Sequence, residues 1–243
     1  MKKFLCAALA CAVCASVLLG VSGCGCSDEK KNQPGYVVPT TVPDLKDENF
    51  GFIVTNQKEV MITTFFGNTK NVVIPETFQN YKITQIGSGV FQDSEIESCE
   101  MADSIREIHD YAFSSCHNLK TIKLSKNLEM LGTNVFFNCS QIENFELPAS
   151  IKSADVYCFA AAAITSVEIP ESNTFNSLDQ YLFFQCQNLK DVTIPPTVTK
   201  IAENTFNDCP NKITFHVVKG SYGESYAKKL AKTNPDKFAV DSK

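Results

Sequence analysis

Cysteine is the side chain with the richest potential chemistry in this chain of 243 residues. Of its 11 cysteines, three lie in the apolar N-terminal run and Cys24 follows that run, which leaves seven. Four of the seven recur at one position of a repeat and two occupy other apolar positions: Cys116, Cys139, Cys186 and Cys209, then Cys99 and Cys158. Export would permit disulfides between Cys116 and Cys139 and between Cys186 and Cys209. We favour buried free thiols, because cysteine behaves as a small hydrophobic residue.

No other group of reactive side chains has the spacing of a catalytic or metal site. Outside the apolar N-terminal run, which contains Cys11-Ala12-Val13-Cys14, the chain lacks a Cys-x-x-Cys pair, and it lacks a Gly-rich phosphate loop, a Gly-x-Ser-x-Gly motif and a His-Glu-x-x-His motif. His109 and His117 fall at outward positions and are expected on the solvated surface, while His216 ends a strand-like stretch. The sequence therefore predicts no enzyme, no metal and no cofactor.

The charge balance also limits the classes of partner. The net charge is −5, and without Lys2 and Lys3 the remaining 20 basic and 27 acidic residues give −7. No basic stripe is present, so nucleic acid is not predicted as a partner. The mildly acidic surface favours solubility.

The N-terminus has the features of an export signal. Lys2 and Lys3 precede an apolar run over residues 4–20, and Val21-Ser22-Gly23 leads directly into Cys24. This ending resembles the lipobox of bacterial lipoproteins. The resemblance implies that residues 1–23 are a lipoprotein signal peptide, and that Cys24 carries lipid on the outer side of a bacterial cell membrane. A membrane-spanning helix is the alternative, since the run approaches the ~20 residues that a span needs.

Residues 24–48 are polar, contain three prolines and show no period. Such a composition predicts a flexible tether between the lipidated Cys24 and a folded part that begins near residue 49.

Six phenylalanines recur at a nearly constant spacing. Their separations are 22, 23, 23, 24 and 23 residues, and they are Phe91, Phe113, Phe136, Phe159, Phe183 and Phe206. Apolar columns lie eight and five residues before each of them, for example at Ile105 and Ile108, and the four recurring cysteines lie three residues after. Because so short a unit cannot bury its own apolar face, the units must stack. The phenylalanines and cysteines are then predicted to form ladders inside a solenoid.

An alternating apolar stretch follows each copy, as in Ile142, Phe145 and Leu147. It predicts a short strand that pairs in parallel with the next coil, about 4.8 Å away. The fourth copy departs most from the pattern, with Ala154 and Ala162 where other copies have larger aliphatic residues and cysteine. We expect a looser or bulged coil there.

This pattern closely resembles the BspA-type leucine-rich repeat of bacterial surface proteins. The copy that matches position by position contains Ile105, Ile108, Ala112, Phe113, Cys116, Leu119, Ile122 and Leu124. The resemblance covers residues 83–217. It implies an α/β-poor repeat solenoid, a right-handed superhelix of about six coils of 22–24 residues with a parallel β-sheet on its concave face. It also implies surface adhesion or protein binding and no catalysis.

Both ends of the repeat carry predicted caps. The stretches FGFIVT, EVMITTF and NVVIP predict a β-rich N-terminal cap over residues 49–82. Residues 218–243 contain GSYGESYAKKLAK, which predicts a helical C-terminal cap with Ser221 and Glu224 as a capping box. Asn234-Pro235 ends this helix.

The outward positions of the predicted strands carry charges whose signs largely alternate from coil to coil. The candidate binding face contains Glu97, Glu100, Lys120, Lys123, Glu143, Glu146, Glu168 and Lys190. Stacked opposite charges are compatible with the sheet alone, at about 0.2–1 kcal/mol per pair. Alternatively, the face binds an extracellular protein, host or bacterial, or a glycan. Contact with the membrane is expected only through the lipid anchor.

Two aromatic columns compete with this face. Tyr111, Tyr157 and Tyr181 share one position of the repeat, and Phe137 and Phe184 share another. We expect them half-buried over the turn. Full exposure would instead make them an interaction patch.

Overall fold

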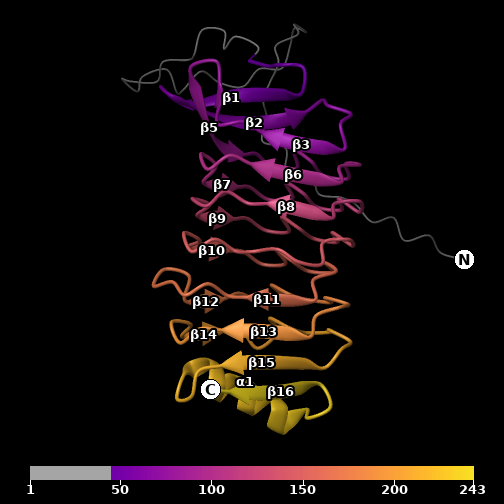
Figure 1. Cartoon of the computed structure of the whole chain (residues 1–243), viewed down its shortest axis with the longest axis vertical. Coiled ribbons are helices and arrows are strands. Elements are labelled where there is room, and N and C mark those ends of the chain that lie inside the picture. Colours follow the sequence, from indigo (N-terminus) through magenta and orange to yellow (C-terminus); the bar gives the residue numbers. More distant parts are fainter. Residues whose placement is uncertain (1–44) are drawn as a thin grey trace, which may run out of the picture. The chain divides into compact units, whose positions relative to one another are not determined.

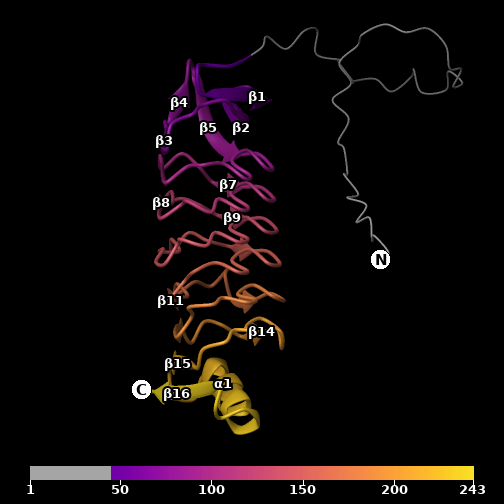
Figure 2. The same ribbon diagram turned by 90° about the vertical axis from the view of Figure 1, so that its right-hand side faces the viewer.

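The computed structural model describes residues 45–243, so the leader, Cys24 and most of the tether lie outside the described residues. The described part is a stack of coils in which each turn of the chain crosses two faces (Figures 1 and 2). The predicted repeat solenoid is confirmed. Most of its regular structure is short parallel strands, with one helix near residue 230.

The first ladder of strands lies five to six residues before the ladder phenylalanines. Its parallel strands are β2 (Glu59–Phe65), β5 (Tyr81–Ile86), β7 (Glu107–Ile108), β9 (Met130–Leu131) and β10 (Ser153–Ala154), and β12 (Ser177–Leu178) pairs in the same way with β14 (Lys200–Ile201). Each rung buries an aliphatic residue, such as Ile108 opposite Leu131. The sequence did not predict this sheet, because strands of two residues are too short to show alternation.

The second ladder is the sheet that the alternating stretches predict. Its strands are β3 (Asn71–Ile74), β6 (Ser98–Met101) and β8 (Thr121–Lys123), followed by β11 (Ser166–Glu168), β13 (Asp191–Ile194), β15 (Ile213–Val217) and β16 (Phe238–Ser242). All neighbours within each group pair in parallel. The third coil contributes β9 to the first ladder but no strand to the second ladder. β8 and β11 are therefore not paired with each other.

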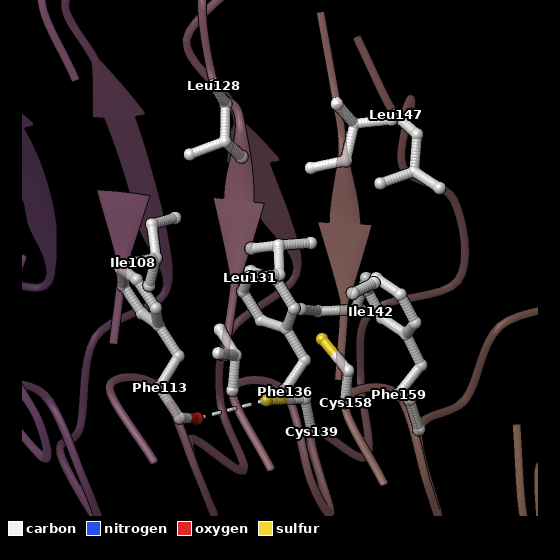
Figure 3. Packing of buried hydrophobic residues seen from close by; sticks show 14 of the residues in the cluster. Ile108, Phe113, Leu128, Leu131, Phe136, Cys139, Ile142, Leu147, Cys158 and Phe159 are labelled. Carbon is white, nitrogen blue, oxygen red and sulfur yellow. Dashed lines mark hydrogen bonds between the residues drawn. The ribbon is translucent and has the colours of Figure 1, made fainter. Parts of the chain in front are cut away.

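The six phenylalanines stack through the core between the two ladders. Consecutive ring centroids are 4.8 to 5.7 Å apart with interplanar angles of 5° to 21°. All six side chains are buried, and Figure 3 shows Phe113, Phe136 and Phe159 stacked among aliphatic residues. Each ring therefore gains its burial from the coils on both sides of it.

The cysteines form a second internal ladder, of thiol hydrogen bonds. Each thiol of the column donates to the carbonyl oxygen of the ladder phenylalanine of the preceding coil. The distance is 3.0 Å from Cys116 Sγ to Phe91 O, and 3.2 Å for Cys139 to Phe113, Cys186 to Phe159 and Cys209 to Phe183. Figure 3 shows the bond from Cys139 to Phe113. All six described cysteines are free and buried. Burial raises the pKa of the Cys116 and Cys209 thiols to about 11, so they stay protonated and can donate.

A tight turn follows each ladder phenylalanine. The residue two positions later has a positive φ of 54° to 58° in all six copies: Asp93, Ser115, Asn138, Ala161, Gln185 and Asp208. Left-handed backbone costs most L-residues free energy, and Asn and Asp tolerate it best. Asp93, Asn138 and Asp208 therefore suit the turn that returns the chain to the second ladder.

The N-terminal cap has the predicted strands. β1 (Phe50–Asn56) pairs antiparallel with β2, and β4 (Thr77–Phe78) forms a small hairpin with β5. Phe50 and Phe65 lie over Phe91, with ring centroids 6.3 and 5.0 Å away. They cover the first rung of the aromatic ladder.

The C-terminal cap contains the predicted helix, α1 (Tyr222–Thr233). Ser221 Oγ accepts a hydrogen bond from the Glu224 backbone N–H at 3.1 Å, and Glu224 Oε2 accepts one from the Gly220 N–H at 2.9 Å. The capping box is thus present, although its return bond reaches Gly220 and not Ser221. After the helix the chain adds β16 to the second ladder, a strand that the sequence did not predict.

Candidate functional site

The outer face of the second ladder carries the candidate binding residues. Strand pairing sets Glu100 beside Lys123 and Thr193 beside His216, so one outward column runs along the stack. A neighbouring column lies where each strand begins, at Glu97, Lys120, Glu143 and Lys190. In Figure 1 these strands are the arrows labelled β6, β8, β11, β13 and β15.

The N-terminal part of this face is electrically paired. Glu97 accepts from Lys70 Nζ at 2.7 Å and lies 3.9 Å from Lys120 Nζ, and Lys123 forms an ion pair with Glu100. The Lys70 hydrogen bond lowers the pKa of Glu97, and the Glu100 hydrogen bond raises the pKa of Lys123. These groups are exposed, so each pair contributes little to stability.

The middle of the face is not paired. Glu143, Glu146 and Glu168 are exposed, and among residues 45–243 none of their carboxylates has an ion-pair or hydrogen-bond partner. Lys190 likewise lacks an ion-pair partner in this part of the chain. The alternation of sign therefore leaves three uncompensated carboxylates where the second ladder is interrupted.

A bulky ring lies at the interruption. Phe145 shares its column with Ile122, Val167 and the buried Phe215, and the turn of the fourth coil contains four alanines, Ala160–Ala163. The half-buried Phe145 ring lies closer to the ladder phenylalanine of the fourth coil than to that of its own coil. Its centroid is 4.6 Å from that of Phe159 and 6.3 Å from that of Phe136. The sequence predicts a looser or bulged fourth coil. In the structure, the segment without regular strand pairing belongs to the third coil, and its Phe145 lies beside Ala162 of the fourth coil.

An apolar pocket accompanies the interruption. Its lining is Ile122, Phe136, Ile142, Phe145, Phe159, Ala162 and Ile164. The empty space of about 190 Å³ includes open solvent, and no part of it is wide enough to hold a water molecule. Within residues 45–243, the only backbone hydrogen bond between segment 143–147 and the fourth coil runs from Thr165 N–H to Glu143 O at 3.0 Å, and none joins the segment to β8. The pocket therefore lies beneath a loosely held backbone.

The C-terminal part of the face holds a histidine between two carboxylates. His216 Nε2 lies 2.9 Å from Asp191 Oδ1, and Nδ1 lies 3.0 Å from Asp241 Oδ2. The hydrogen bonds to Asp191 and then Asp241 raise the pKa of His216. Sequence reasoning missed this cluster because Asp241 lies on β16. The alternation of Phe238 and Val240 is the signal that could have revealed that strand.

The aromatic columns form a separate cluster at the turns. Tyr157 and Tyr181 stack with centroids 4.8 Å apart, and the Phe184 ring meets both edge-on at 5.9 and 5.5 Å. All three are half-buried, as predicted, whereas Tyr111 is 44% exposed. The cluster lies outside the charged sheet face.

Two further observations concern the described residues only. No group of three or more His, Cys, Asp or Glu side chains in residues 45–243 has a geometry suited to a metal ion. In the same range, no helix has the length and apolar character that a membrane span requires.

Comparison with known proteins identifies the repeat. The family model for the BspA type leucine rich repeat region matches six copies over residues 55–160 and 84–213. No curated protein matches the chain significantly.

Solved structures share the fold at low sequence identity. A leucine rich cell surface protein from Faecalibacterium prausnitzii has 23% identity and a TM-score of 0.61 over 73% of this chain and 55% of its own. A leucine rich repeat protein of T. pallidum has 16% identity and a TM-score of 0.59 over 82% of this chain and 98% of its own. The pneumococcal vaccine antigen PcpA has 19% identity and a TM-score of 0.55 over 72% of this chain and 42% of its own. The chain thus spans only about half the length of the first of these proteins.

Proposed function

This chain belongs to the BspA-type leucine-rich repeat family, and we propose that it is a non-catalytic bacterial surface lipoprotein whose second-ladder face binds an extracellular protein. The partner is a protein of a host or of a neighbouring cell, so the activity is adhesion. The observation that carries this proposal is an exposed, ring-poor sheet face whose central carboxylates have no internal partner in the described residues.

Several features support protein as the partner class. The outward columns of the second ladder carry Glu, Lys, Thr, Asn and Ser, which can form hydrogen bonds and ion pairs with a protein surface. Sugars stack on aromatic rings, and the stacked Tyr157 and Tyr181 lie away from this face. A glycan-binding or envelope-organising role at that aromatic cluster is the alternative function.

Export and lipid anchoring are part of the same proposal. The charged start, the apolar run and the small residues before Cys24 support a lipoprotein signal. Two acyl chains on one residue give stable anchoring, because each buried CH₂ contributes about 0.8 kcal/mol. The polar stretch after Cys24 would then hold the repeats away from the membrane.

The binding proposal is tested with the processed chain carrying Cys24→Ser, presented to host cells and to neighbouring bacterial cells. Target cells are treated beforehand with protease, which removes surface proteins, or with periodate, which oxidises the diols of sugars. We expect protease to abolish binding and periodate to leave it intact. Loss with periodate alone would favour the glycan alternative, and absence of binding to either cell type would contradict adhesion.

The anchor is tested separately in the producing cell. Cys24→Ser should move the protein from the membrane fraction into the soluble fraction and abolish incorporation of labelled palmitate. The matched Cys26→Ser variant should remain in the membrane fraction and should still incorporate labelled palmitate. Continued membrane association of Cys24→Ser would favour a membrane-spanning N-terminus.

A further inference from the structure

We propose that the outer face of the N-terminal cap rests on the lipid bilayer that holds the anchor. The contact is made by three apolar side chains, Ile53, Met61 and Phe66, which we call the cap patch. This inference rests on the lipid anchoring proposed above. It goes beyond that anchoring because it adds a contact between protein and lipid, which fixes the end of the stack that faces the membrane.

Exposed apolar side chains are concentrated in this cap. Within residues 45–243, seven large apolar side chains are exposed, and four of them lie in the cap: Ile53, Val54, Phe66 and Val73. Phe66 is 56% exposed. Single exposed apolar residues are ordinary on a protein surface, whereas a local group of them marks an interaction site. The cap therefore has apolar surface that its own packing does not cover.

Strand β1 brings two of the three patch side chains together. Phe50 and Phe52 are buried, so Gly51 between them has its outer side toward the surface. The Phe66 ring covers that side, because a Cβ added to Gly51 would lie 3.4 Å from the ring. Ile53 points the same way as Gly51, since alternate residues of a strand share a face. Phe66 and Ile53 are therefore neighbours on the outer face.

Met61 extends the patch onto the neighbouring strand. It lies directly opposite Ile53 in the antiparallel pair of β1 and β2. Val60 and Ile62 on either side of it are fully buried, so Met61 points outward, where it is half-buried. Facing residues of paired strands have Cβ atoms about 4.5–5.5 Å apart. The cap patch is thus continuous across both strands.

The tether enters the described unit beside the patch. The Phe52 N–H donates to the carbonyl oxygen of Leu45 at 2.7 Å, so the first described residue lies along the outer edge of β1. Residues 24–44 connect Leu45 to Cys24, and a segment of this length spans at most about 75 Å. The anchor therefore keeps the cap near the bilayer. A weak contact is then sufficient, because the effective concentration of lipid is high.

The charge distribution favours the same end. Residues 45–82 contain four lysines and four acidic residues, whereas residues 83–243 contain 14 basic and 20 acidic residues. An anionic lipid surface repels the acidic remainder of the stack but not the neutral cap. The cap and α1 lie at opposite ends of the stack (Figures 1 and 2). Contact through the cap therefore leaves the repeats standing away from the membrane.

The size of the patch favours a bilayer over a second copy of this chain. Stable protein interfaces bury about 1,600 Å² in total and use ~20–30 residues on each side. Three side chains supply a small part of that. A bilayer accepts apolar side chains singly at the boundary between head groups and acyl chains, and the anchor already provides most of the affinity.

Tryptophan fluorescence tests the contact, because the chain contains no tryptophan of its own. The processed chain, residues 24–243 with Cys26→Ser, is coupled through Cys24 to maleimide-bearing phosphatidylethanolamine in vesicles of phosphatidylcholine and phosphatidylglycerol. The six described cysteines are buried and stay unmodified. On coupling, the emission of the Phe66→Trp variant should shift to shorter wavelength. Brominated acyl chains should quench it, since such contacts lie ~5–10 Å into the boundary with the acyl chains.

Two kinds of control separate the patch from mere proximity to the vesicle. Val218→Trp puts the reporter at an exposed position near the opposite end, where emission should neither shift nor be quenched. In the Phe66→Trp background, Ile53→Thr with Met61→Thr should weaken the quenching severalfold, because these changes remove the rest of the patch. Val73→Thr is the matched variant and should leave quenching unchanged, since Val73 is exposed in the same cap but lies on the second ladder.

A shift and quenching that are confined to the Phe66→Trp reporter, and that Ile53→Thr with Met61→Thr weakens, would support the contact. No shift on coupling, or equal quenching of the reporters at Phe66 and Val218, would overturn it. Emission that is already shifted without vesicles would also overturn it. In that case, loss of the shift on dilution would assign the patch to a second copy, and persistence would assign it to another segment of this chain.

The outcome is independent of the proposed anchoring, because the maleimide supplies the anchor chemically. If palmitate labels the chain at Cys24 in cells but the coupled reporter is not quenched, the anchor stands and the cap contact is wrong. If the coupled reporter is quenched but no palmitate is incorporated, lipid anchoring fails and the affinity of the cap patch for lipid stands. Melting temperatures of all variants should agree within a few degrees, because the substituted side chains are exposed or half-buried.

Discussion

At the scale of single residues, the thiol ladder explains why cysteine recurs in a column that other small residues could fill. Each buried Sγ–H donates to a phenylalanine carbonyl, so the side chain supplies both volume and a hydrogen bond. Ala162 is the one member of the four-coil run from Cys116 to Cys186 that cannot donate. The column therefore contains a natural matched pair for measuring this bond.

We predict opposite effects for two substitutions in this column. Cys139→Ala should lower the free energy of unfolding by about 1–3 kcal/mol, since it removes a buried hydrogen bond and leaves a void. Ala162→Cys should raise it by about 0.5–1.5 kcal/mol, because Ala162 lines the apolar pocket and the new thiol can donate. Urea denaturation measures both values. A destabilised Ala162→Cys chain would show that the fourth coil has no room for sulfur.

His216 should make the stability of the C-terminal coils depend on pH. Its pKa is raised above the ordinary value of 6.5, chiefly by Asp191 and then by Asp241, with Lys243 Nζ 3.9 Å from Asp241. A raised pKa in the folded state means that the stabilisation is fully present below about pH 6.5 and is lost as pH rises through the higher folded value. The melting temperature of the parent chain minus that of His216→Gln should therefore shrink from pH 6 to pH 9. A difference that grows over this range would contradict the cluster.

At the scale of elements, each coil depends on its neighbours for burial. Phe113 stacks between Phe91 and Phe136 with centroid distances of 4.8 and 5.5 Å and is fully buried. Phe113→Ala should cost about 3–5 kcal/mol, the usual loss for a core phenylalanine. Tyr111→Ala is the control, since that ring is 44% exposed in the same turn. Calorimetry that gave equal shifts for both variants would refute the inward ladder.

Periodicity predicted most of these elements, and the exceptions have physical reasons. The inward columns of the six copies and α1 follow from residue type and spacing, because burial of a repeated side chain leaves a repeated signal. The first ladder left no strand signal in the sequence, since strands such as β7 and β9 are only two residues long. The interruption left none either, because segment 143–147 has the same apolar alternation as the stretches that do form strands.

The candidate face was predictable to a similar extent. Alternating signs predicted the pairs Glu97–Lys120 and Glu100–Lys123, which the structure contains. They did not predict which carboxylates remain unpaired, because that depends on side-chain reach between coils. They also could not give the His216 cluster, because its third member, Asp241, comes from the unpredicted strand β16.

At the scale of the whole described unit, the stack resembles a one-dimensional chain of coils joined by nearest-neighbour interfaces. Such a stack normally opens first at its ends, and here both ends are covered, by β1 on one side and by α1 with β16 on the other. The weakest interface should then lie inside, where segment 143–147 makes no backbone hydrogen bond to β8.

Hydrogen exchange should reveal this internal weak point as a minimum of protection in the middle of the stack. Amides of residues 143–147 and of β11 should exchange faster than those of β6 and β13, because local opening there breaks fewer hydrogen bonds. Protection that falls smoothly from the centre toward both ends would instead mean that the third and fourth coils are coupled as tightly as the others.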